Sequence, residues 1–150
     1  MNIILQHMDG DLRPLDKLSM QNMQQYAQMV GADYELVTGK PFRKHLTGAC
    51  QKVYMLDEKY DAYDQVLMVD IDMFAPKGMT ENVFELRGVG LYADTQIMLH
   101  KKIANHNPMF ASIAHAYWGG AIYKMDKQLR QRLRRHFGGD ESWMLPYNKA

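Results

Sequence analysis

The chain has 150 residues, of which 47% are hydrophobic and 23% charged, and its formal net charge is +1. This length favours a single domain over residues 1–150, and the composition is typical of a globular protein rather than a disordered segment or a disulfide scaffold. Because the charges nearly balance, nothing attracts the whole chain to nucleic acids, and we expect no nucleic-acid partner.

The location of the protein is predicted from its cysteine content and its apolar segments. Cys50 is the single cysteine, which excludes an intrachain disulfide. The apolar residues 3–5 are followed at once by Gln6, too early for a signal peptide. No stretch approaches the roughly 20 apolar residues that cross a bilayer. We therefore expect a cytoplasmic protein without a transmembrane segment.

The first third of the chain predicts a strand, a helix and a second strand. Residues 2–7 form a short apolar run that ends in polar residues, and the turn sequence DGD follows at 9–11. The spacing of apolar residues predicts a helix over 14–30, which Gly31 would end. Residues 34–37 predict the next strand.

The remaining elements continue the alternation of helix and strand. We predict a helix over 47–60 and then a strand at 66–69, where four consecutive apolar residues indicate burial on both faces, as in a parallel sheet. Further strands are predicted at 88–93 and 120–125, followed by an amphipathic helix over 126–137. This order predicts an α/β fold with a largely parallel sheet flanked by helices.

Asp70 and Asp72 follow the most hydrophobic strand directly. In open α/β sheets, ligands bind at the carboxyl ends of the strands. Two carboxylates held together repel unless a cation neutralises them, and hard oxygen ligands suit Mg²⁺ or Mn²⁺ bound together with substrate phosphates. The alternative is an ordinary turn at the end of a strand with solvated aspartates.

Three segments resemble those of DxD glycosyltransferases with the GT-A fold, such as glycogenin-like enzymes and small glycosyltransferases of bacteria and large DNA viruses. The sequence YDQVLMVDIDMFAP at 63–76 resembles the DxD segment, and residues 80–85 resemble the small helix that follows it. The sequence YWGGAIY at 117–123 is similar to the strand start that lines the sugar site. The sequence GGDES at 138–142 resembles the later acidic block.

This resemblance implies a GT-A-like three-layer sandwich, Mn²⁺ or Mg²⁺ as cofactor, a UDP- or GDP-sugar donor, and a glycan or other glycosylated acceptor. It implies that Asp72 binds the metal and that Asp70 contacts the metal or the donor, with Ile71 between them in the donor site. Asp140 or Glu141 would act as general base on the acceptor hydroxyl, or would instead cap a helix.

Five further residues are candidates for binding the nucleotide-sugar. His7 and Asp9 could border the base, although a turn at Asp9 is the favoured interpretation. Lys52 could contact the donor, although a solvated helix lysine is the favoured interpretation. Gly119 and Gly120 would let the chain approach a sugar closely, or would form a tight turn.

The helix predicted at the end of the chain carries a basic run. Its members share the side opposite the apolar stripe: Lys127, Arg130, Arg132, Arg134 and Arg135. We interpret them as a solvated helix face, with peripheral contact to an anionic membrane as the alternative.

Three other functions are alternatives to glycosyl transfer. A phosphatase of the haloacid-dehalogenase kind places its Asp-x-Asp after the first strand, whereas here the pair follows the third. A metal nuclease would need more acidic ligands and a basic channel. A non-catalytic domain that binds nucleotide-sugar without turnover is favoured by Gly119, which stands where many glycosyltransferases have Asn.

Overall fold

The computed structural model describes residues 1–86, 90–91 and 122–137. The strands in these ranges are β1 (Asn2–Met8), β2 (Ala32–Thr38), β3 (Gln65–Val69), β4 (Gly90–Leu91) and β5 (Ile122–Asp126). The helices are α1 (Pro14–Met29), α4 (Lys127–Phe137) and the 3-10 helices η1 (Gly48–Leu56), η2 (Glu58–Ala62) and η3 (Val83–Glu85).

The strands form one sheet in the order β2-β1-β3-β5-β4. Strands β1, β2 and β3 are parallel to one another, β5 is antiparallel to β3, and β4 is antiparallel to β5. Only β5 therefore runs against the other four. The predicted α/β fold with a mostly parallel sheet is confirmed.

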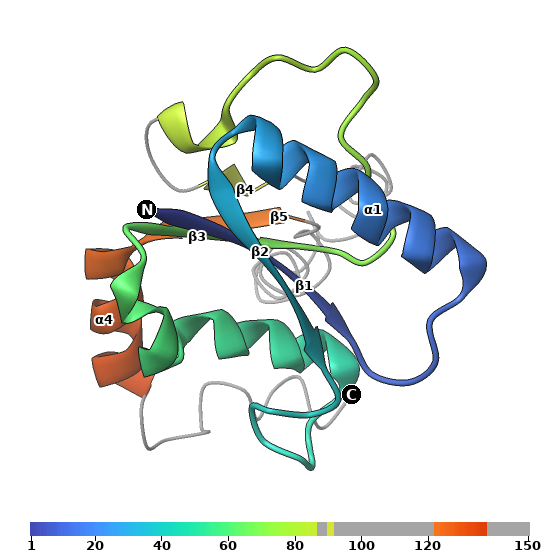
Figure 1. Ribbon diagram of the computed structural model, residues 1–150. Helices are drawn as coiled ribbons and strands as arrows, with labels where there is room; N and C mark the ends of the chain where they lie inside the picture. The colour runs from blue at the N-terminus through green and yellow to red at the C-terminus, as the bar shows by residue number, and fades with distance from the viewer. Residues whose placement is uncertain (87–89, 92–121, 138–150) are drawn as a thin grey trace, which may run out of the picture.

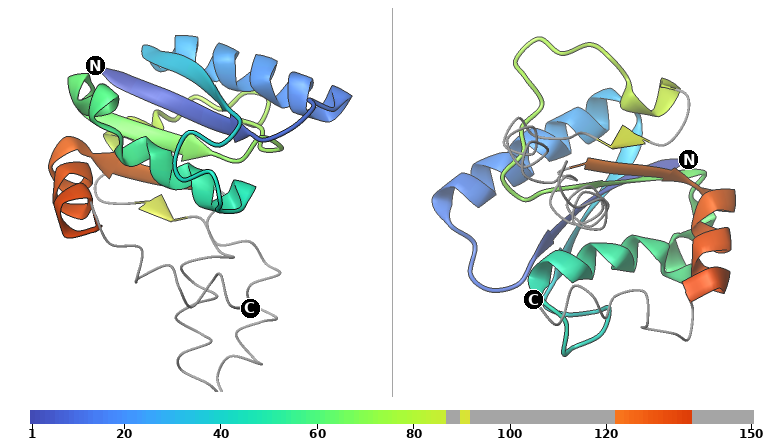
Figure 2. Two further views of the ribbon diagram at one scale, coloured as in Figure 1. Left: turned by 90° about the horizontal axis from the view of Figure 1, so that it is seen from below. Right: turned by 180° about the vertical axis from the view of Figure 1, so that it is seen from behind.

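Helices cover both faces of this sheet (Figure 1). Helix α1 lies over one face, whereas η1 and α4 lie on the other side, as the two further views also show (Figure 2). The predicted arrangement of a sheet between two helical layers is therefore confirmed for the described residues.

The two halves of the core follow from the alternation of side chains along β1 and β3. Ile4, Leu67 and Val69 point to α1 and pack with its apolar residues. Ile3 and Met68 point to the opposite face, where they pack with residues of η1 and η2. Both strands are thus covered on both sides, as the apolar run at 66–69 predicted.

The boundaries of α1 agree with the sequence. The backbone N–H of Arg13 and its guanidinium both donate to the carboxylate of Asp16, which satisfies donors at the start of the helix. Gly31 adopts a φ of 66°, a left-handed conformation that ends the helix.

The helix predicted over 47–60 differs from the structure, which has η1 and η2 in its place. The break falls at Asp57, whose backbone is extended with a ψ of 146°, while its side chain accepts a hydrogen bond from the N–H of Lys59. Asp57 thus starts a new helix instead of continuing the old one. The small helix expected over 80–85 is limited to η3, which Asn82 caps by accepting from the N–H of Phe84.

Candidate functional site

The carboxyl ends of three parallel strands meet at one edge of the sheet. Met8 at the end of β1 pairs with Thr38 at the end of β2, and Val69 at the end of β3 pairs with Gln6. Strand β5 runs the other way, so its first residue, Ile122, lies opposite Val69 at the same edge. The candidate residues that follow these strands are therefore gathered where α/β sheets bind ligands.

Asp70 and Asp72 lie on a tight turn rather than on a continued strand. Strand β3 ends at Val69, and the N–H of Met73 donates to the carbonyl of Asp70 over 3.2 Å. Asp70 is thus the first residue of the turn and Asp72 the third. The side chain of Asp70 is partly buried, whereas Asp72 is exposed. The turn presents one carboxylate to solvent and holds the other against the sheet.

Lys52 of η1 forms an ion pair with Asp70. Because Met68 points to the η1 side of the sheet, the alternation along β3 directs Asp70 to the same side. The Nζ atom of Lys52 also lies 5.8 Å from the ring centre of Tyr123 on β5, within the range of a cation–π contact. Lys52, Asp70 and Tyr123 thus form one cluster from three elements, and the interpretation of Lys52 as a solvated lysine is wrong.

Burial dominates the electrostatics of this cluster. It raises the pKa of Asp70 above its usual value, Lys52 opposes this shift, and the nearby charge of Asp72 adds to it. Burial likewise raises the pKa of Tyr123, and the charge of Asp70 contributes.

A buried hydrogen-bond network holds both ends of the turn. The side-chain amide of Gln6, which is fully buried on β1, donates to the carbonyl of Asp70 and to the hydroxyl of Ser19, each over 3.0 Å. Ser19 of α1 donates in turn to the carbonyl of Met73. The oxygen of the Gln6 amide accepts from the hydroxyl of Tyr34 over 2.8 Å. The backbone of the turn is therefore fixed from α1 and β1 together.

Helix α1 also holds the segment that follows. The side chain of Asn22 donates to the carbonyl of Ala75 and accepts from its N–H, over 3.1 and 2.7 Å. The hydroxyl of Tyr26 donates to the carbonyl of Glu81 and accepts from the N–H of Val83. Side chains of α1 thus pair several backbone groups of the irregular segment 73–83.

No family model matches the sequence, and no curated protein sequence matches it. Among solved structures, the chain is similar to the crystal structure of a glycosyltransferase involved in the glycosylation of the major capsid of PBCV-1, with a TM-score of 0.57 and 10% identity. The match covers 95% of this chain and 68% of that chain. This chain has the fold of that glycosyltransferase. Because only 10% of the residues are identical, the match shows the fold and not the chemistry of the site. That chemistry has to be inferred from the residues of this chain.

The residue types at the turn fit an open metal site. Within the ranges that the structure describes, no three His, Cys, Asp or Glu side chains are grouped to hold a metal ion. Mg²⁺ and Mn²⁺ are commonly held by only one or two carboxylates, with water and substrate phosphates as the remaining ligands. Asp70 and Asp72 would supply these two carboxylates, and Asp70 is paired with Lys52 in this structure.

His7 and Asp9 lie at the same edge of the sheet, where both contact the turn that follows β2. The Nε2 atom of His7 donates to the carbonyl of Gly39 over 2.7 Å, which ties the end of β1 to the turn after β2. Asp9 is exposed and lies 3.8 Å from the Nζ atom of Lys40. Gly10 beside it has a φ of 116°, as the predicted turn requires.

The other predicted site residues lie outside the described residues. These are Gly119, Gly120, Asp140 and Glu141. Their roles remain predictions from the sequence.

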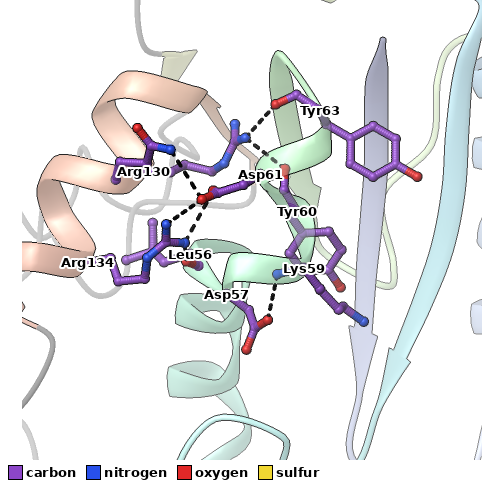
Figure 3. Close-up of polar contacts among 9 residues, drawn as sticks. Leu56, Asp57, Lys59, Tyr60, Asp61, Tyr63, Arg130 and Arg134 are labelled. Carbon is purple, nitrogen blue, oxygen red and sulfur yellow. Dashed lines mark hydrogen bonds and ion pairs between the residues drawn. The ribbon is translucent and has the colours of Figure 1, made fainter.

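The interpretation of the basic run on α4 as a solvated face is wrong for two of its residues (Figure 3). Arg130 is fully buried and donates to the carbonyls of Tyr60 and Tyr63 over 3.0 and 2.7 Å. Arg134 donates to the carbonyl of Leu56 and pairs with Asp61 over 2.6 Å. Both arginines therefore dock α4 against η1 and η2 and are not available to a membrane.

The other basic residues of the run, Lys127, Arg132 and Arg135, are exposed. None of the helices within the described ranges is long and apolar enough to cross a membrane.

Three supporting residues were not among the sequence candidates. Gln6 had a visible signal, since it is polar and directly follows the apolar run of β1. Tyr123 ends the segment 117–123 that resembles the strand start lining the sugar site, but the sequence did not single it out. Ser19 had no signal, because nothing distinguishes it from other polar residues of the helix. Only the packing of α1 and β5 beside β3 brings them to the turn.

Proposed function

We propose that this chain is a glycosyltransferase domain that binds a nucleotide-sugar with the help of a divalent cation and transfers the sugar to a hydroxyl of a glycan or other acceptor. The observation that carries the proposal is the Asp70–Asp72 turn at the carboxyl end of a central strand. The fold shared with a viral glycosyltransferase supports it, because that edge is where such sheets bind ligands.

The described residues have separate roles in this proposal. Exposed Asp72 binds the cation directly, and Asp70 provides the second carboxylate from the edge of the sheet. Mn²⁺ or Mg²⁺, when bound, neutralises the diphosphate of the donor and the charge that develops as the nucleoside diphosphate leaves. Gln6 and Ser19 keep the two carboxylates in place by fixing the turn at both ends.

The remaining roles are carried from the sequence. Asp140 or Glu141 takes the proton of the acceptor hydroxyl in an inverting transfer, or orients the sugar in a retaining one. Gly119 and Gly120 precede β5 along the chain and line the sugar site. His7 and Asp9 border the nucleotide base.

The first test is thermal stability with UDP- and GDP-sugars, each with Mn²⁺ and with EDTA. A ligand that binds only the folded protein stabilises it by about 2.7 kcal/mol at one hundred times its Kd. We expect the melting temperature to rise only when donor and metal are both present, and the responding nucleotide identifies the base. No shift with any donor at high concentration would contradict the proposal.

Asp72→Asn tests the metal site directly. The change keeps the size of an exposed side chain and removes its charge, so the ligand-free melting temperature should stay the same. The shift produced by donor and metal should be lost. Asp11→Asn, at another exposed aspartate, is the matched control and should keep the shift. An undiminished shift in Asp72→Asn would remove the aspartate pair from the mechanism.

Turnover separates an enzyme from a binding domain. Metal-dependent release of nucleoside diphosphate from the donor, by transfer or by slow hydrolysis, is expected of a glycosyltransferase. Metal-dependent binding without any release would identify a non-catalytic nucleotide-sugar-binding domain.

A further inference from the structure

Helix α1 begins on the side of the sheet at which β1 and β3 end (Figure 1), and Arg13 directly precedes it. The guanidinium group of Arg13 donates to the carboxylate of Asp16 through Nε over 2.9 Å and through Nη2 over 2.8 Å. Asp16 is fully buried, whereas the side chain of Arg13 is 63% exposed. Within the described ranges, the third nitrogen, Nη1, has no hydrogen-bond partner. The guanidinium group is therefore held in a fixed plane with its outer edge in solvent.

The first turns of α1 run beside the turn that carries Asp72. Ser19, whose hydroxyl donates to the carbonyl of Met73, lies about 9 Å along the helix axis from Arg13. The hydrogen bond and the charge of Asp16 raise the pKa of Arg13, and the charge of Asp72 adds to this shift. Arg13 thus places a permanent positive charge within electrostatic range of the exposed carboxylate that is proposed to hold the cation.

The proposed site needs a positive group besides the cation. Asp70 and Asp72 together carry two negative charges, which one divalent cation balances. The diphosphate of a nucleotide-sugar brings two further negative charges, and more charge develops on it as the nucleoside diphosphate leaves. Arginine suits this task because its planar guanidinium group presents parallel N–H groups to phosphate oxygens.

We propose that Arg13 binds the diphosphate of the donor through the outer edge of its guanidinium group, while Asp16 holds that group in place. The contact is to the phosphate that carries the sugar, because the electron pair of the broken bond to the sugar goes to an oxygen of this phosphate. A nucleoside monophosphate lacks this group, so Arg13 makes the site select nucleoside diphosphates. This inference rests on the proposed function and adds a donor-binding residue to the same site.

The test is the affinity for UDP and UMP, or for GDP and GMP, with Mn²⁺ present, in the wild type and in Arg13→Gln. Calorimetry measures the binding of the diphosphate, and competition with the diphosphate measures the binding of the monophosphate. We expect Arg13→Gln to bind the nucleoside diphosphate about ten-fold more weakly, since charge-assisted hydrogen bonds are lost. Its affinity for the monophosphate should stay the same, so the preference of the site for two phosphates falls.

Two further variants keep the test interpretable. Arg13→Gln leaves the buried carboxylate of Asp16 without its described cation, so the ligand-free melting temperature has to show that the variant folds. If it does not fold, the double variant Arg13→Gln/Asp16→Asn takes its place, because it removes both charges together. Lys17→Gln is the matched control: it removes one positive charge from an exposed position in the first turn of α1 and should leave both affinities unchanged.

The outcomes separate this inference from the proposed function. If the nucleoside diphosphate binds the wild type and the folded Arg13 variants equally, Arg13 does not bind it, and the metal site stands. If diphosphate and monophosphate weaken by the same factor, Arg13 only shapes the site, and the inference is likewise overturned. If the wild type binds no nucleotide with Mn²⁺, the proposed function fails, and the role of Arg13 fails with it.

Discussion

Gln6 makes three hydrogen bonds from a fully buried position on β1. A buried amide is costly unless its donors and acceptor are paired, and here the partners are Ser19, Tyr34 and the backbone of Asp70. The network thus repays the burial of Gln6 and fixes the start of the turn that carries Asp70. Ser19 extends it to the end of the turn at Met73. At the scale of single residues, the position of the turn depends on buried side chains from two other elements.

Ser19→Ala should destabilise the protein. The change leaves the carbonyl of Met73 and one N–H of Gln6 without their described partner in a buried region, which costs about 1–3 kcal/mol. Chemical denaturation measures the loss. Thr80→Ala, which removes the hydroxyl group of an exposed threonine near the same segment, should change the unfolding free energy by less than about 0.5 kcal/mol. Equal stability of the two variants would show that the network does not hold the turn.

At the scale of elements, α4 is docked by arginines rather than by apolar contacts alone. Arg134 donates to the carbonyl of Leu56 at the end of η1. Arg130 donates to the carbonyl of Tyr63, directly after η2, and to the carbonyl of Tyr60, which also accepts from the N–H of Tyr63. Asp126 caps the start of α4 by accepting from the N–H of Leu129 over 2.7 Å. This use of charge explains why the hydrophobic stripe alone did not identify the buried side of the helix.

Arg130→Lys should destabilise the docking of α4. Lysine keeps the charge but lacks the planar fork that reaches Tyr60, Tyr63 and the carbonyl of Met125 at once, so buried carbonyls lose their donors. We expect a loss of about 1–3 kcal/mol in the unfolding free energy. Arg132→Lys, at an exposed position of the same helix, is the matched control and should be neutral. If both substitutions are neutral, the described contacts of Arg130 do not stabilise the fold.

At the scale of the whole molecule, the strands of the sheet differ in how well they are shielded from solvent. Strands β1 and β3 are central and have both faces covered by helices. Strand β2 is at the edge of the sheet and is mostly half-buried, and β1 is its only partner among the described strands. The candidate site lies at the end of the best-protected strands, so a rigid scaffold supports it.

Amide hydrogen exchange should follow this order. Peptides from β1 and β3 should exchange slowest, close to the rate set by global unfolding, whereas peptides from β2 should exchange faster through local opening. Exchange measured by mass spectrometry at neutral pH checks the expectation. Equal protection of the β2 and β3 amides from exchange would indicate that these strands open only together, by global unfolding.

Much of the fold follows from local pattern. The strands β1, β2 and β3, the two α-helices and the stop at Gly31 were predicted because hydrophobic periodicity and glycine conformation act over a few residues. The division of the predicted helix 47–60 was missed, since it depends on the extended backbone at Asp57. The antiparallel direction of β5 was also beyond prediction, because the direction of a strand depends on chain connection rather than on its own residues.

The sequence by itself determined the order of the elements, the parallel character of the sheet and the place of Asp70 and Asp72 at the end of a buried strand. This was possible because buried faces of helices and strands require hydrophobic residues at regular spacings along the chain. Only the tertiary structure decided that Lys52 pairs with Asp70, that Gln6 and Ser19 hold the turn, and that Arg130 is buried. These contacts join residues far apart in the chain, and a charged or polar residue carries no local sign of which partner will neutralise it.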